Sequence, residues 1–206
     1  MLADYSVAML QNYRQFGAGS VLAFFMLAFL HGDKPMEDDS LLKGKRVLLV
    51  DDEADVLEAL EELLSMCEVC KADSFEAARE YLQSQHFDLA VLDIMGVKGY
   101  ELLDIAVNSN VTAVMLTAHA LQPENIVKSY TKGAASFLPK EQMVSIAAFL
   151  NDILEAKEQG KNPWTRWYGR LASFFEDKFG PELQDMARKR KGILDEREFW
   201  EKFPFH

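Results

Sequence analysis

The sequence predicts an α/β protein with a doubly wound parallel sheet, and three observations support this. Short apolar runs of strand length alternate with segments whose apolar residues recur at helical spacing. This strand–helix alternation repeats five times in the middle of the chain, whereas both ends of the 206 residues differ in composition. Right-handed crossovers place helices on both faces of a parallel sheet. We therefore expect five strands between two helical layers.

The first two strand–helix units begin at Val47–Val50, a continuously apolar run that ends in acidic residues. The apolar residues from Val56 to Leu64 recur at helical spacing and predict the first helix. A second strand is predicted at Glu68–Ala72. A second helix is predicted at Phe75–Gln85, with Ser74 as a candidate N-terminal cap.

The other three units follow the same alternation. The predicted strands are Leu89–Leu92, Ala113–Leu116 and Ser136–Leu138. The predicted helices are Tyr100–Val107, a helix that Pro123 opens, and Met143–Leu154. The five units together predict one domain over residues 41–158.

The charge of the chain argues against nonspecific binding to nucleic acid. The formal net charge is −11, and residues 36–160 contain more than twice as many acidic as basic residues. Phosphates repel such a surface, whereas divalent cations are attracted to it. We therefore expect no nucleic-acid partner.

Both cysteines lie in one Cys-x-x-Cys pair, Cys67 and Cys70. A zinc site needs about four ligands, and the sequence has no second pair of this kind. We interpret the two residues as small apolar side chains rather than a redox centre, which fits a cytoplasmic protein with reduced thiols.

Residues 1–40 form a separate N-terminal extension in this interpretation. The apolar run Val21–Leu30 is about half the roughly 20 residues that a membrane-spanning helix needs, so we expect no stable span. Three alternatives stay open: a buried or partner-binding helix, a weak membrane-surface anchor, or upstream sequence included by a misassigned start. We favour the last, because Met36 begins an acidic leader into the first strand.

Residues 159–206 are predicted to be a helical, aromatic-rich tail that begins after a break at Gly160 and Asn162-Pro163. One face of its first helix carries Trp164, Trp167, Tyr168, Leu171, Phe175 and Phe179. About 46 residues are marginal for an independent core, so we expect these aromatics to pack on the preceding domain, on a second copy or on another protein.

The tail also contains the basic run Arg188–Lys191, which has two interpretations. Acids open that helix, bases close it and Gly192 follows, as the helix macrodipole favours. We prefer this interpretation, and a DNA-binding regulator with a cryptic tail stays the alternative.

Five polar residues stand where the predicted strands end. Asp51 and Asp52 follow the first strand, Asp93 the third, Thr117 the fourth and Lys140 the fifth. In a parallel sheet these ends share one edge, where ligands bind. Clustered carboxylates need a cation, and Mg²⁺ takes hard oxygen ligands. This set suits phosphoryl transfer, with Asp93 as nucleophile and with Thr117 and Lys140 contacting the transferred oxygens.

At these residues the chain closely resembles the receiver domains of response regulators, over about residues 45–156. The resemblance rests on Val-Leu-Leu-Val-Asp51-Asp52-Glu, Val-Leu-Asp93-Ile-Met, Met-Leu-Thr117-Ala and Phe137-Leu-Pro-Lys140. It implies a flavodoxin-like fold, a phosphoacceptor protein rather than a conventional enzyme, and a histidine kinase or phosphotransfer protein as donor.

The resemblance also implies specific roles for single residues. Asp52 would bind Mg²⁺ directly, Asp51 directly or through water, and Asp93 and the backbone carbonyl of Met95 would complete the protein ligands. Phe137 falls at the family's switch aromatic. The phosphorylated form would act on a downstream protein or through self-association by the tail.

Two features depart from the family pattern. The loop after Asp93 is about two residues shorter than usual. Proline usually follows the family's lysine, often across a cis bond, but here Pro139 precedes Lys140 and Glu141 follows it. A cis bond at Lys140–Glu141 would cost about 3 kcal/mol, so we expect trans and a slightly altered lysine position. A pseudo-receiver that binds partners without phosphorylation therefore stays an alternative.

Overall fold

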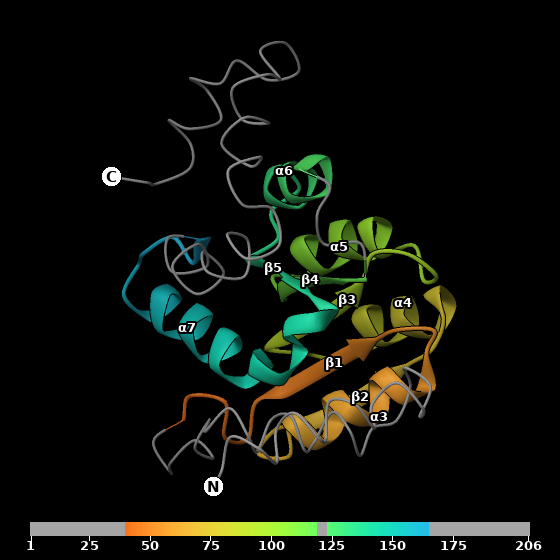
Figure 1. Cartoon of the computed structure of the whole chain (residues 1–206), viewed down its shortest axis with the longest axis horizontal. Coiled ribbons are helices and arrows are strands. Elements are labelled where there is room, and N and C mark those ends of the chain that lie inside the picture. The colour runs from red at the N-terminus through yellow and green to blue at the C-terminus, as the bar shows by residue number, and fades with distance from the viewer. Residues whose placement is uncertain (1–39, 119–122, 165–206) are drawn as a thin grey trace, which may run out of the picture.

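The computed structural model describes residues 40–118 and 123–164 (Figure 1). The described residues contain one parallel sheet of five strands in the order β2-β1-β3-β4-β5. The strands are β1 (Arg46–Val50), β2 (Glu68–Ala72), β3 (Leu89–Asp93), β4 (Thr112–Thr117) and β5 (Ser136–Pro139). The predicted fold class is confirmed.

The helices alternate with the strands along the chain. They are α3 (Ala54–Leu63), α4 (Phe75–Ser84), α5 (Gly99–Asn108), α6 (Pro123–Thr131), the 3₁₀-helix η1 (Lys140–Ser145) and α7 (Ile146–Glu158). In Figure 1, α3 and α7 cover one face of the sheet and α4, α5 and α6 cover the other. This arrangement is the two-sided covering that parallel crossovers produce.

The apolar runs in the sequence are continuous because the inner strands are covered on both faces. Every residue of β3 and of β4 is buried, including the polar residues Asp93, Thr112 and Thr117. The edge strand β2 is only partly buried over most of its length. The core therefore lies around β1, β3 and β4, and it fixes where these strands end.

Two local predictions needed correction. Ser74 is the residue that precedes α4, with extended backbone angles of φ −148° and ψ 156°, but its side chain makes no capping hydrogen bond. The helix expected at Met143–Leu154 starts instead as η1 and becomes α-helical at Ile146. Apolar spacing does not separate these two helix types over one turn, because residues three apart lie on one side in both.

The chain just before β1 belongs to the folded unit. Leu42 is fully buried, and the side-chain Oδ1 of Asn151 in α7 accepts a hydrogen bond of 3.0 Å from the backbone N–H of Leu41. The Sγ of Cys67 donates a hydrogen bond to the carbonyl of Leu42. Burial raises the pKa of the Cys67 thiol to about 11, and both cysteines are partly buried and free.

Several predictions concern residues outside the described ranges. These include the N-terminal apolar run, the aromatic face beyond Trp164 and the basic run at 188–191. Within residues 40–118 and 123–164, no helix is long and apolar enough to cross a membrane.

Candidate functional site

Three charged side chains meet at the carboxyl edge of the sheet. Asp51 directly follows β1, Asp93 is the last residue of β3, and Lys140 directly follows β5. The Nζ of Lys140 lies 2.7 Å from Oδ2 of Asp51 and 3.2 Å from Oδ1 of Asp93. The sequence places these residues far apart, and the parallel strand order brings them together as predicted.

Asp51 is completely buried, and its two oxygens differ. Oδ1 accepts a hydrogen bond of 3.0 Å from the backbone N–H of Glu53. Oδ2 has no other hydrogen-bond partner, and its close contact is the ion pair with Lys140 Nζ at 2.7 Å. Burial raises the pKa of the Asp51 carboxyl, although the interaction with Lys140 opposes this.

Asp93 is only 3% exposed and is held by the loop that follows it. Its Oδ2 accepts a hydrogen bond of 2.7 Å from the backbone N–H of Met95, which leaves Oδ1 toward Lys140. The backbone therefore fixes Oδ2 of Asp93, while Oδ1 faces the Lys140 ammonium group.

Lys140 contacts a third acid, Glu53, whose Oε1 accepts a hydrogen bond of 2.8 Å from Nζ. The lysine side chain is 14% exposed, whereas that of Glu53 is 62% exposed. Burial alone would lower the pKa of Lys140, but the carboxylates of Asp51, Glu53 and Asp93 raise it above its usual range. The ammonium group therefore stays charged and neutralises part of the acidic cluster.

The loop after Asp93 is a tight turn. The backbone N–H of Lys98 donates to the carbonyl of Met95 at 3.0 Å, and the N–H of Gly99 donates to the carbonyl of Ile94 at 3.3 Å. Lys98 has a left-handed backbone with φ 53° and immediately precedes α5. The helix consequently starts directly beside the phosphoacceptor candidate.

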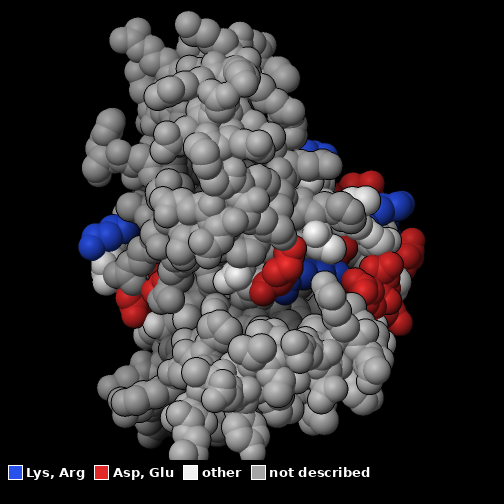
Figure 2. Space-filling view, viewed as in Figure 1, with Lys and Arg blue, Asp and Glu red and all other residues white. Residues whose placement is uncertain are grey.

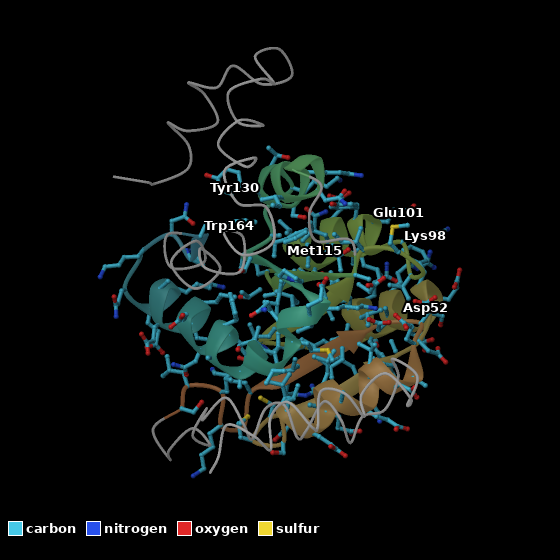
Figure 3. The ribbon with its side chains drawn as sticks, in the orientation of Figure 1. Asp52, Lys98, Glu101, Met115, Tyr130 and Trp164 are labelled. Carbon is cyan, nitrogen blue, oxygen red and sulfur yellow. The ribbon has the colours of Figure 1, made fainter. Side chains whose placement is uncertain are left out.

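Two glycines of this turn lie against neighbouring atoms, Gly99 against backbone and Gly96 against a side chain. A Cβ on Gly99 would overlap the backbone carbonyl of Asp93. A Cβ on Gly96 would overlap the carboxylate of Asp52, so this exposed side chain lies against the glycine backbone. In Figure 3, Asp52 lies on the side of the molecule where Lys98 and Glu101 mark the start of α5.

The remaining predicted site residues lie at or behind this edge. Thr117 is buried at the end of β4, and its Cα is paired with that of Pro139 in β5. Phe137 in β5 is also fully buried. All peptide bonds in the described ranges are trans, including Lys140–Glu141, which confirms that prediction.

The donor set suits a hard divalent cation in chemistry. Asp51 Oδ2 is a buried carboxylate oxygen whose close partner is the Lys140 ammonium group. Asp52 lies next to it on the loop after β1, and the Met95 carbonyl lies on the loop after β3. Among the described residues, however, no three acidic, histidine or cysteine side chains form a metal cluster by themselves. A magnesium ion would therefore need the Met95 carbonyl or water beside the carboxylates, which Mg²⁺ commonly uses.

The acidic character of this edge is visible on the surface. Figure 2 shows acidic side chains gathered on the side toward which the β1 arrow points in Figure 1, with basic groups between them. Sequence reasoning had not identified Glu53 or Gly96 as parts of the site. The only signal for Glu53 was its position directly after the acidic pair.

Comparison with known proteins agrees with this arrangement. The family model for the response regulator receiver domain matches residues 47–150. The two-component response regulators ARR18 and ARR12 of Arabidopsis thaliana are 35% and 33% identical over 108 and 109 residues, about 50% of this chain. These matches cover only 17% and 18% of the two plant proteins.

Solved structures show the same fold. A CheY-like receiver domain protein from Methanospirillum hungatei has a TM-score of 0.52 at 25% identity, covering 57% of this chain and 98% of that one. A receiver domain of the Francisella response regulator 1452 has a TM-score of 0.51 at 20% identity, covering 55% of this chain and 99% of that one. The sheet order, the acidic edge and these matches together show that the chain belongs to the response regulator receiver domain family of two-component systems.

Proposed function

We propose that this protein accepts a phosphoryl group on Asp93 in a Mg²⁺-dependent reaction and thereby switches a protein-interaction surface. The donor in this proposal is a histidine kinase or a phosphotransfer protein. The observation that carries the proposal is the position of Lys140 Nζ, within 3.2 Å of Asp93 Oδ1 and 2.7 Å of Asp51. A cation at this place can stabilise charge on the oxygens of a transferred phosphoryl group.

The proposed step is an in-line displacement at phosphorus. Asp93 Oδ1 attacks, the oxygen–phosphorus bond forms, and the phosphorus–nitrogen bond to the donor imidazole breaks. The electron pair of the broken bond stays on the imidazole nitrogen, which takes up a proton from solvent water. The Met95 N–H fixes Asp93 Oδ2 at 2.7 Å, so the nucleophile is oriented before the donor arrives. Thr117, at the buried end of β4, is the proposed second contact to the transferred oxygens.

The residues that would hold Mg²⁺ are Asp51, Asp52, Asp93 and the Met95 carbonyl. A bound magnesium ion supplies charge neutralisation for an anionic phosphoryl group that approaches three carboxylates. Lys140 already contacts Asp51 and Asp93, so the ammonium group must shift within the site or share it with the ion. Phe137, buried in β5, is the proposed switch residue.

Intact-mass measurement tests the proposal directly. Incubation with acetyl phosphate and Mg²⁺ should add one phosphoryl group to the wild type and none to Asp93→Asn. Asp55→Asn is a matched control, because Asp55 is an exposed carboxylate in the first turn of α3, and it should be labelled like the wild type.

The possible outcomes separate the remaining alternatives. Equal labelling of Asp93→Asn would show that another residue is the acceptor. A wild type that is never labelled, by acetyl phosphate or by a phosphorylated donor protein, would favour the pseudo-receiver. A cytoplasmic location, a downstream protein partner and the absence of a nucleic-acid partner stay predictions of this proposal. A salt-dependent DNA shift assay tests the last of these.

A further inference from the structure

One ammonium group faces three carboxylates at the candidate site. Lys140 Nζ lies 2.7 Å from Oδ2 of Asp51 and 3.2 Å from Oδ1 of Asp93. It also donates a hydrogen bond of 2.8 Å to Oε1 of Glu53. An ammonium group has three N–H donors, so these three acids together can occupy all of them. A second cation that binds the same carboxylates must therefore displace the lysine from at least part of this cluster.

The three acids differ in burial and in their proposed roles. Asp51 is completely buried and Asp93 is 3% exposed, whereas the side chain of Glu53 is 62% exposed. Asp51 and Asp93 are proposed ligands of Mg²⁺, and Glu53 is not among those ligands. A divalent ion on the two buried acids repels the ammonium group, because like charges interact strongly where water is largely excluded. Glu53 is therefore the carboxylate that Lys140 can keep as its partner when the ion is bound.

The backbone of Glu53 is fixed on both sides. Its N–H donates a hydrogen bond of 3.0 Å to Oδ1 of Asp51. Its carbonyl accepts hydrogen bonds from the N–H groups of Val56 at 3.1 Å and Leu57 at 3.2 Å, at the start of α3. Its backbone angles of φ −92° and ψ 108° are those of a residue that directly precedes a helix. The side chain of Glu53 thus starts from a fixed point beside the buried acids.

The backbone of Lys140 is also fixed, but its side chain can reorient. Pro139 ends β5 with extended backbone angles of φ −63° and ψ 139°, and Lys140 is the first residue of η1. A lysine ammonium group sits on a flexible stem of four carbons. Nζ can therefore change its partners among the three acids without any change in the strand that carries it.

We propose that Glu53 is a positioning residue that receives the Lys140 ammonium group when Mg²⁺ binds Asp51 and Asp93, and that this exchange sets the affinity of the site for Mg²⁺. The inference rests on the proposed function, because it takes these two carboxylates as metal ligands. Glu53 stabilises the state in which the lysine has left them. Its loss favours the state in which the lysine still occupies them, since a group shifts an equilibrium by its difference in interaction with the two states.

Mg²⁺ binding to the full-length, unphosphorylated protein tests the exchange without any phosphodonor. The protein is titrated with magnesium chloride, and binding is followed by the NMR shifts of backbone amides. Glu53→Gln should raise the Mg²⁺ concentration at half-saturation about fivefold, which lies within the usual range for groups of one charge network. Asp55→Asn removes an exposed carboxylate two positions away, in the first turn of α3, and should have a clearly smaller effect because salt screens exposed charges.

A double-mutant cycle with Lys140→Met shows whether Glu53 acts through the lysine. Lys140→Met by itself should bind Mg²⁺ more tightly than the wild type, because no ammonium group competes for the carboxylates. In this background, Glu53→Gln should weaken Mg²⁺ binding no more than Asp55→Asn does in the same background. The difference between the two effects of Glu53→Gln measures the coupling between Glu53 and Lys140.

Glu53→Asp tests the same contact without the substitution of Lys140, which is expected to lower stability. This variant keeps the negative charge and shortens the side chain by one carbon. The shorter carboxylate should hold the displaced ammonium group less well, so the Mg²⁺ concentration at half-saturation should rise as it does in Glu53→Gln. The dispersion of the amide signals in the same spectra checks that each variant is folded.

Two results would overturn the inference. One is an effect of Glu53→Gln that is equally large with and without Lys140→Met, which would mean that Glu53 binds the ion itself or acts as a general charge. The other is a Glu53→Asp variant with the Mg²⁺ affinity of the wild type. Failure of the proposed function looks different: neither acetyl phosphate nor a phosphorylated donor protein would label the wild type, while the coupling between Glu53 and Lys140 in Mg²⁺ binding would persist.

Discussion

The ammonium nitrogen of Lys140 lies 2.7 Å from a carboxylate oxygen of Asp51, and the two side chains are 14% and 0% exposed. The lysine is the close cationic partner of this buried oxygen, which has no other hydrogen-bond partner. A buried carboxylate without its cation is strongly destabilising, because neither water nor a counter-charge compensates it. The site thus couples the stability of the fold to the groups proposed for phosphoryl transfer.

Lys140→Met should lower the free energy of unfolding by about 3 kcal/mol at neutral pH, the lower end for a broken buried pair because the lysine is partly exposed. Burial already raises the pKa of Asp51, and loss of Lys140 raises it further. The deficit should therefore shrink as pH falls through that raised pKa and the carboxyl becomes neutral. Urea denaturation at several pH values measures this.

Lys71→Met is the matched control for that experiment. Lys71 pairs with Glu61 on the surface, where the two side chains are 37% and 47% exposed. Its loss should cost less than about 1 kcal/mol. If Lys140→Met were no more destabilising than Lys71→Met at neutral pH, the buried Lys140–Asp51 pair would not contribute about 3 kcal/mol to the free energy of unfolding.

Gly96→Ala should impair the proposed magnesium site more than the fold. The added Cβ would overlap the Asp52 carboxylate, which must then move. We expect the Mg²⁺ concentration needed for half-maximal phosphorylation by acetyl phosphate to rise about tenfold, as for other groups that orient metal ligands. Gly44→Ala serves as control, since no atom lies near its Cβ position and its φ of 72° affects only local strain. An unchanged requirement for Mg²⁺ in Gly96→Ala would exclude Asp52 as a ligand in this position.

A chain that begins at Met36 should keep the melting temperature and the phosphorylation of the full protein. A chain that begins at Lys43 should lose about 3 kcal/mol, because it lacks the fully buried Leu42. It also lacks the Leu41 N–H that donates to Asn151. Thermal unfolding of both chains decides this. A lower melting temperature already at Met36 would show that residues before it stabilise the fold.

Asp88 should stabilise the protein above pH 4 and lose this effect in acid. Partial burial by itself would raise its pKa, but the backbone N–H of Arg46 at 2.9 Å and the Lys45 ammonium at 3.4 Å lower the pKa overall. A carboxyl whose pKa is lowered by folding contributes stability above its unfolded pKa, and this stability disappears as pH falls through the folded pKa.

Asp88→Asn should therefore be less stable than the wild type by about 1.5 kcal/mol at neutral pH, the usual contribution of a hydrogen bond to a charged group. The difference should begin to shrink below the ordinary carboxyl pKa and disappear below the lowered pKa of folded Asp88. Urea denaturation between neutral pH and pH 3 is the measurement. A difference that stays constant across this range would mean that the charge of Asp88 contributes nothing.

The sequence alone determined the order of elements and the edge at which the site lies. The continuous apolar runs at β1, β3 and β4 indicate strands buried on both faces, and apolar residues at helical spacing indicate helices buried on one face. Each pattern lies within one short segment, so it can be recognised without the rest of the structure. The parallel arrangement then places Asp51, Asp93 and Lys140 at one edge whatever the loops do, and the structure shows these side chains in contact.

Only the tertiary structure decided contacts that depend on the path of loops. Glu53 accepts a hydrogen bond from Lys140, which lies 87 positions later in the sequence. The Trp164 indole donates to the Ala134 carbonyl, which lies 30 positions earlier. The contact of Gly96 with Asp52 depends on the short turn after Asp93. The spacing of apolar residues carries no information on such contacts. It shows which face of one helix or strand is buried, but not which loop residues lie beside the end of that element. The residue types in the sequence indicate which residues could form a site, but only the folded structure determines which residues they contact.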